Sequence, residues 1–88
     1  MKTTFRTSFA KDLKAIKSKA VLEAITKLIE AVETAQDLRT IPDVKKLKGK
    51  GDYYRIKLGD FRVGVTLGKS EITFVRCLDR KEIYRYFP

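Results

Sequence analysis

The sequence predicts an α+β fold, with two N-terminal helices packed on an antiparallel sheet and a short helical turn at the C-terminus. Apolar residues recur with a helical period early in the chain and alternate with a period of two later on. The 88 residues suffice for one hydrophobic core, and neither a repeat nor a long linker divides them. We therefore expect one domain over residues 1–88, with its elements in the order β-α-α-β-β-β.

The N-terminal part of the chain predicts a strand followed by a helical hairpin. Residues 2–6 are compatible with a strand. Ser8 precedes apolar residues at helical spacing, so we expect it to cap a first helix. Ser18 can cap a second helix over residues 19–35, whose apolar stripe should pack on the sheet. That stripe consists of Val21, Ile25, Leu28, Ile29, Val32 and Ala35.

Residues 53–65 give the clearest local signal, two strands joined by a two-residue Gly59-Asp60 turn. A turn of this length fixes the register, so we expect Lys57 to lie opposite Arg62. Alternation then makes one face of the hairpin apolar and the other basic. The apolar face holds Tyr54, Ile56, Leu58, Phe61, Val63 and Val65. The basic face holds Tyr53, Arg55, Lys57, Arg62 and Gly64.

The basic face of this hairpin is the leading candidate for a polyanion site. It carries three cations, two of them directly opposite each other, and like charges in cross-strand pairs are destabilising. The whole chain has 20 Lys and Arg against 11 Asp and Glu, a net charge of +9 that suits nucleic acid. An acidic protein would also fit such a face. In so basic a chain, a merely solvated surface could have the same composition.

Residues 37–52 predict an irregular segment, since Pro42 ends any helix and lysines crowd around two glycines. This segment is either a solvated loop or a basic arm that contacts phosphates beside the site. Phosphate contacts supply salt-sensitive affinity without sequence information. The lysines expected to make them are Lys46, Lys48 and Lys50.

The C-terminal third predicts one more strand and a helical turn. Residues 71–78 are apolar at both parities, so we expect an interior strand buried on both faces. Cys77 should be a core residue and not a nucleophile. Asp79 can cap the following turn, where Arg80 and Tyr84 are four residues apart and share a face near the basic hairpin.

Composition excludes several classes of function. The chain has no histidine, which removes the usual imidazole acid and base and most zinc and iron sites. We therefore expect neither a metal nor a cofactor, and any catalysis must use Lys, Arg, Tyr or carboxylates. A single cysteine allows no internal disulfide and fits a reducing cytoplasm. Neither a signal peptide nor a membrane-spanning run is recognisable.

Two stretches of the sequence resemble the RelE/ParE superfamily of bacterial toxins from toxin–antitoxin modules. The first is Lys46-Leu47-Lys48-Gly49 followed by residues 53–63, with the Gly-Asp turn and Phe-Arg-Val. The second is residues 76–84, Arg-Cys-Leu-Asp-Arg-Lys-Glu-Ile-Tyr, which is similar to the family's C-terminal ending. For the RelE branch, the resemblance implies an endoribonuclease that cuts mRNA in the ribosomal A site without a metal. It also implies a cognate antitoxin, bound in a hetero-oligomer.

The resemblance also implies roles for individual residues. It places the family's basic pair on Arg55 and Lys57, and its phosphate-binding arginine on Arg62. The C-terminal arginine and tyrosine fall on Arg80 and Tyr84. We expect Lys57 to act as general base, because neighbouring cations disfavour its protonated form. Arg62 and Arg80 remain charged and suit stabilisation of the phosphate, while Tyr84 could stack on a base, orient the 2′-hydroxyl or relay a proton.

The remaining expected contacts are those that hold the substrate. They are Arg55, Tyr53, Arg76, Lys46, Lys48 and Lys50. Two positions depart from the family pattern, since Asp79 stands where many relatives have histidine and Arg55 where some have lysine. Two alternatives stay open: a gyrase poison of the ParE type, and a nucleic-acid-binding module without enzymatic activity.

Overall fold

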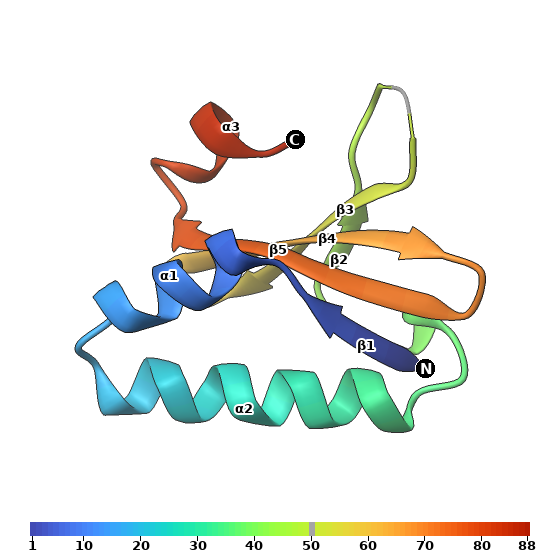
Figure 1. Cartoon of the computed structure of the whole chain (residues 1–88), viewed down its shortest axis with the longest axis horizontal. Helices are drawn as coiled ribbons and strands as arrows, with labels where there is room; N and C mark the ends of the chain where they lie inside the picture. The colour runs from blue at the N-terminus through green and yellow to red at the C-terminus, as the bar shows by residue number, and fades with distance from the viewer. Residues whose placement is uncertain (50) are drawn as a thin grey trace.

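The structure, a computed structural model, describes residues 1–49 and 51–88. Lys50, one of the expected phosphate contacts, lies outside the described residues. The chain forms a five-stranded sheet in the order β1-β5-β4-β3-β2, with α1 and α2 on one side and α3 on the other (Figure 1). The elements are β1 (Lys2–Phe5), α1 (Thr7–Ala15), α2 (Lys19–Thr34), a 3-10 turn η1 (Leu38–Thr40), β2 (Val44–Lys46), β3 (Tyr53–Leu58), β4 (Phe61–Gly68), β5 (Glu71–Asp79) and α3 (Ile83–Tyr86). The predicted α+β class is confirmed.

Two features of the sheet differ from the prediction. Strand β1 pairs in parallel with β5, with Lys2 opposite Glu71 and Phe5 opposite Phe74, so the sheet is mixed and not wholly antiparallel. Strand β2 lies in the segment expected to be irregular, and it pairs antiparallel with β3. Its three residues include two lysines, so its pairing depends on the neighbouring strand more than on its own sequence.

The two helix caps have different outcomes. Ser18 caps α2 as expected, since its Oγ accepts a hydrogen bond from the Val21 amide at 3.3 Å. The prediction for Ser8 is wrong, because α1 begins at Thr7 and Ser8 lies inside its first turn. The Ser8 hydroxyl instead donates to the carbonyl oxygen of Val75 at 2.6 Å, which ties α1 to β5.

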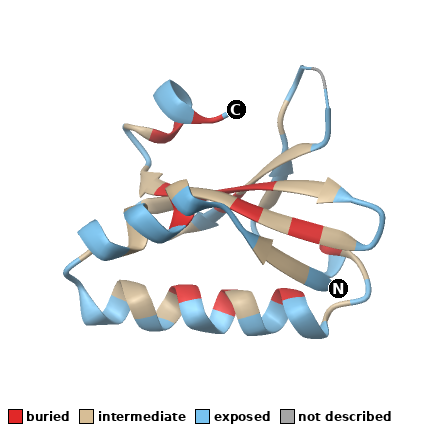
Figure 2. Cartoon of the chain, in the orientation of Figure 1, coloured by how far each residue is buried: buried red, intermediate tan, exposed pale blue. Residues whose placement is uncertain are grey.

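The β3–β4 hairpin has the predicted register throughout. Lys57 lies opposite Arg62, Ile56 opposite Val63 and Leu58 opposite Phe61. Gly59 adopts a φ of +59°, the left-handed conformation that a two-residue turn requires. The inward-facing residues of this hairpin pack with those of α2 to form the core between sheet and helices (Figure 2).

A β-bulge in β5 explains why this strand is apolar at both parities. Val65 pairs with Phe74 and Gly64 with Arg76, which leaves Val75 as the extra residue. The bulge shifts the alternation by one, so that Phe74 and Cys77 both point into the core. The strand is interior, as predicted, but the expectation of burial on both faces is wrong, because Val75 is only half-buried.

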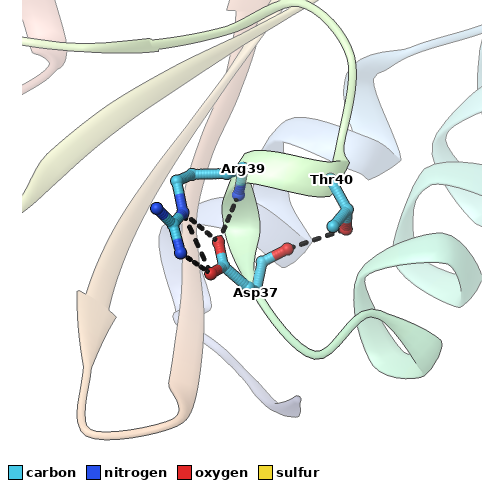
Figure 3. A network of polar contacts seen from close by, with 3 residues as sticks. All are labelled: Asp37, Arg39 and Thr40. Carbon is cyan, nitrogen blue, oxygen red and sulfur yellow. Dashed lines mark hydrogen bonds and ion pairs between the residues drawn. The ribbon is translucent and has the colours of Figure 1, made fainter.

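The connection from α2 to β2 is fixed by η1. The carboxylate of Asp37 accepts hydrogen bonds from the backbone amide of Arg39 at 2.7 Å and from its guanidinium (Figure 3). The Thr40 hydroxyl donates to the Asp37 carbonyl oxygen at 2.8 Å. These bonds to Arg39 hold the pKa of the Asp37 carboxyl below its usual range.

Within residues 1–49 and 51–88, no helix combines the length and apolarity that crossing a bilayer requires.

We expect the thiol of Cys77 to be inert in the folded protein. Its side chain is buried, and burial raises its pKa to about 12. Because the folded pKa lies above the unfolded value, its contribution to stability is complete below about pH 8.5 and declines as the pH rises toward 12. Titration with a thiol-reactive disulfide reagent at pH 8 should label no cysteine in the native state and one in denaturant. Rapid labelling of the native protein would contradict this placement.

Candidate functional site

The cations of the hairpin gather on the outer face of the sheet, away from α1 and α2. Lys57 and Arg62 lie directly opposite each other, and the next row runs from Arg55 through Gly64 to Arg76. Lys57 is exposed, whereas Arg55 and Arg62 are half-buried. The predicted basic face therefore exists, and its width extends from β3 to β5.

The C-terminal segment covers part of this face. Ile83 and Phe87 are buried, and the Phe87 ring lies directly on Gly64. A Cβ atom at Gly64 would come within 2.7 Å of that ring, so only glycine leaves room for it. Tyr53 meets the edge of the Phe87 ring with the centroids 5.6 Å apart. Tyr53, expected to contact substrate, is thus a packing partner of the C-terminal segment.

Helix α3 brings Tyr84 to Arg55. The Arg55 guanidinium carbon lies 5.5 Å from the centroid of the Tyr84 ring, within the range of a cation–π contact. Tyr84 remains 62% exposed, so its hydroxyl is accessible from solvent. The Nε of Arg55 is buried and has no hydrogen-bond partner among the described residues. Among the described residues, no carboxylate lies within 4.0 Å of the Arg55 guanidinium. Its positive charge therefore remains available to an anion.

Arg62 and Arg80 lie at the β3–β4 turn. One terminal nitrogen of Arg62 donates to the carbonyl oxygens of Gly59 at 2.8 Å and Phe61 at 2.9 Å. The backbone amide of Arg80 donates to the Asp60 carbonyl oxygen at 2.9 Å, which fixes Arg80 beside the same turn. In the described part of the chain, neither guanidinium has a carboxylate within 4.0 Å.

Arg76 differs from the other arginines of this face. Its Nε and one terminal nitrogen donate to the Asp12 carboxylate at 2.8 and 3.0 Å, and this partner raises the pKa of Arg76. Its guanidinium also lies 5.2 Å from the centroid of the Tyr86 ring. Asp12 accepts a further bond from the Cys77 amide at 2.9 Å. This geometry links α1, β5 and α3 and gives Arg76 a structural role, whereas its contact with substrate stays a prediction.

The register of β2 changes the set of lysines at the site. Lys46 pairs with Tyr54 on the core side and lies 3.8 Å from Asp52, so it does not reach the basic face. Lys45 pairs with Arg55 and points to the basic face, although the sequence did not single it out. The pairing of β2 with β3 decides which of the two lysines points to the outer side of the sheet. Lys48 is exposed in the following loop, where no described contact ties it to the face.

The residues brought together here can bind a phosphodiester. From here on, the term basic face means this set on the outer side of the sheet and no longer the hairpin surface alone: Lys45, Arg55, Lys57, Arg62, Arg80 and Tyr84. Five positive charges and one phenol meet without an acidic side chain paired to them in the described residues. Such a surface attracts polyanions and can stabilise charge that develops on a phosphate.

Comparisons with known proteins decide the family. The family described as ParE toxin of type II toxin-antitoxin system, parDE, matches residues 4–84. Toxin RelE3 of Methanocaldococcus jannaschii is 39% identical over 89 residues, which cover 100% of both chains. The chain belongs to the RelE/ParE toxin superfamily. This membership confirms the resemblance found in the sequence, whereas the roles of single residues stay predictions.

Solved structures of the RelE/ParE superfamily match the whole fold. A RelB–RelE antitoxin–toxin complex from Methanococcus jannaschii gives a TM-score of 0.83 at 38% identity, covering 97% of this chain and 99% of that chain. An archaeal RelE–RelB complex from Pyrococcus horikoshii gives 0.73 at 25% identity, covering 90% and 93%. The mixed sheet and its two helices are therefore those of RelE structures.

Replacing Gly64 with alanine should dislodge the C-terminal segment. The added methyl group would overlap the Phe87 ring, and overpacking of this kind costs about 1–3 kcal/mol. Urea denaturation of Gly64→Ala should show this loss. Gly68→Ala in the same strand is the matched control, because its Cβ would lie 3.8 Å from the nearest atom. Equal stability of the two variants would show that Phe87 does not rest on Gly64.

Replacing Asp12 with asparagine should destabilise the fold more than a comparable change at the surface. The Asp12 side chain is 9% exposed and that of Arg76 is 23% exposed, so Asp12→Asn leaves a poorly hydrated guanidinium unpaired. We expect a loss of about 2 kcal/mol in the free energy of unfolding. Asp52→Asn removes the partner of Lys46 from an exposed pair and should cost less than about 1 kcal/mol. Similar losses for both would contradict a structural role for Asp12.

Proposed function

We propose that the chain is a type II toxin that cleaves mRNA on the ribosome without a metal. The observation that carries this proposal is the basic face, where Tyr84 lies beside Arg55 and the cations have no paired carboxylate among the described residues. Membership of the RelE/ParE superfamily and the 39% identity to a protein named Toxin RelE3 support it. Cleavage then uses the nucleophile that RNA itself supplies, its 2′-hydroxyl.

The proposed reaction is an internal transfer at phosphorus. Lys57 acts as the general base and takes the proton of the 2′-hydroxyl, whose oxygen forms a bond to the adjacent phosphorus. The bond from phosphorus to the 5′-oxygen breaks, and the leaving oxygen takes a proton from solvent water, which gives a 2′,3′-cyclic phosphate and a 5′-hydroxyl. Lys57 then returns the proton it accepted to solvent. Arg62 and Arg80 stabilise the negative charge that builds up on the phosphate and on the leaving oxygen. Tyr84 orients the reacting ribose or stacks on a base.

The chemistry of these groups argues for help from the ribosome. Lys57 is exposed, and the chain has no histidine, the side chain that is ordinarily available in its unprotonated form at neutral pH. Orientation of a reacting group can supply about 7–11 kcal/mol of a barrier. We propose that the ribosome, acting in the A site, holds the mRNA so that a weakly activated site suffices.

An antitoxin partner follows from the same family assignment. The matched archaeal structures are complexes of RelE with RelB. We propose that a cognate antitoxin binds this chain in a hetero-oligomer and neutralises the basic face. The toxin would act in the cytoplasm, where the translating ribosomes are.

A ParE-like gyrase inhibitor is the second candidate function. The description of the matching family, which names the ParE toxin, favours it. A gyrase inhibitor would cause DNA damage signalling while mRNA stays intact. Mapping of mRNA 5′ ends after brief induction separates the two, because breaks at codon positions inside translated frames arise only from the nuclease.

Substitutions in the basic face should abolish cleavage without unfolding the protein. We expect Arg62→Ala and Arg80→Ala each to lower the rate of mRNA cleavage on translating ribosomes about 100-fold or more, because one charged donor to the phosphate is lost. Tyr84→Phe should lower the rate about tenfold, because the hydroxyl that orients the ribose is lost. Tyr86→Phe is the matched control, because Tyr86 is exposed on the same helix and contacts Arg76 instead of the basic face.

The same assay has a clear contrary result. If Tyr86→Phe and Arg62→Ala lost activity equally, the loss would reflect the C-terminal segment as a whole and not the chemistry of the basic face. Purified protein that cleaved free RNA as fast as translating mRNA would contradict the dependence on the ribosome.

A further inference from the structure

The N-terminal helices carry a second cluster of positive charge, separate from the basic face. The first 22 residues contain six Lys and Arg and a single acidic residue, Asp12. Asp12 is already neutralised by Arg76. We call Lys11, Lys14, Lys17 and Lys19 the lysine ridge. All four are exposed on α1, the α1–α2 connection and the start of α2, and no described carboxylate lies within 4.0 Å of them.

The lysine ridge opposes the electrostatics of its own helices. Lys11 and Lys14 are three residues apart on α1, where like charges repel. Neither helix has an acidic residue in its first turn, and α2 begins with Lys19, a cation at the positive end of the helix dipole. A surface selected only for solubility or helix stability would place acids at these positions. The arrangement therefore favours an anionic partner.

The surface between the lysines favours RNA over a protein as that partner. Besides the lysines, the exposed residues between Lys11 and Lys19 are the small Ala15 and Ser18, with Ala10 and Ala20 at the two ends of the ridge. Glu23 lies one helical turn beyond Lys19, at the α2 end of the ridge. Protein interfaces have aromatic or large apolar anchors and few lysines at their centre, whereas phosphate contacts need only reachable charge. The ridge also has no aromatic side chain on which an unpaired base could stack. This composition fits the phosphate backbone of a duplex, which proteins recognise by shape and charge.

The lysine ridge ends beside the catalytic end of the basic face. Lys17 and Ser18 line a hollow of about 290 Å³ together with Leu78 and Asp79, the residue before Arg80. Ala20, next to Lys19, lines a second hollow of about 250 Å³ with Gly59 and Asp60 of the β3–β4 turn. The α1–α2 connection and this turn thus lie at one end of the molecule (Figure 1).

We propose that the lysine ridge binds the phosphate backbone of double-helical RNA, as a docking surface distinct from the face that acts on the single strand. Binding there would place Arg80 and the β3–β4 turn next to a structured RNA while the basic face holds an unpaired segment. The ridge contributes affinity without sequence preference, because lysine contacts phosphate as a point charge. The proposal goes beyond cleavage and does not depend on it.

The test measures binding of an RNA hairpin whose riboses are all 2′-O-methylated, so that no cleavage can occur. The ridge variant is Lys11→Gln, Lys14→Gln and Lys17→Gln in one full-length chain. The control variant is Lys2→Gln, Lys27→Gln and Lys69→Gln, which removes the same charge from exposed positions elsewhere. Glutamine keeps high helix propensity, and circular dichroism checks that both variants are folded.

We expect the ridge variant to reduce the slope of log Kd against log salt by about 2, since each lost phosphate contact removes about 0.7–0.9. Its affinity at 0.15 M salt should fall at least tenfold, whereas the control should change less than threefold. Equal changes in both variants would overturn the proposal, because they would reflect net charge alone. The proposal would also be overturned if the ridge variant kept its affinity for the RNA hairpin but lost binding to a poly-glutamate peptide. The surface would then recognise an acidic protein. Failure of mRNA cleavage would leave these binding results unaffected.

Discussion

The contact of Phe87 with the backbone of Gly64 is the interaction on which the candidate site depends. Helix α3 has four residues, far too few to be stable in isolation. Its position follows from the burial of Ile83 and Phe87 against the outer side of the sheet, with Tyr53 packed on the Phe87 ring. These residues form a small apolar cluster apart from the main core. Because Tyr84 lies within this segment, its approach to Arg55 requires a glycine in the middle of β4.

Five of the arginines divide into two groups by their partners. Arg39 and Arg76 form close ion pairs with Asp37 and Asp12, and they fix the η1 turn and the junction of α1 with β5. Arg55, Arg62 and Arg80 have no such acid in the described residues, although Arg62 is bonded to backbone carbonyl oxygens. Among the described residues, the close ion pairs therefore belong to arginines that hold the fold together. Arg55, Arg62 and Arg80 keep a positive charge that a phosphate can approach.

The sequence predicted those features that local chemistry fixes. The Gly59-Asp60 turn set the register of β3 and β4 residue by residue, and Ser18 marked the start of α2. The predictions that the structure corrects concern features that depend on contacts between residues distant in sequence. Ser8 bonds to a carbonyl that a bulge in β5 makes available, and no local pattern reveals this. The bulge also places Arg76 within reach of Asp12, and pairing with β3 alone decides that Lys45, and not Lys46, joins the basic face. Tyr53 was expected on the basic side of the hairpin. Its packing on Phe87 could not be predicted without knowing the path of the C-terminal segment.

The shape of the site bears on how such a protein could act. The hollows around the η1 turn and around the α1–α2 connection are lined by residues outside the basic face. Lys57 and Tyr84, by contrast, are exposed to solvent. An open, solvated surface screens its charges and leaves a flexible RNA free to adopt many unreactive geometries. Under the proposed function, rapid cleavage would require a second body that excludes water and fixes the ribose and phosphate in line. A docking surface at the α1–α2 end would hold that second body against the β3–β4 turn, next to Arg62 at the start of β4, where the missing orientation is needed.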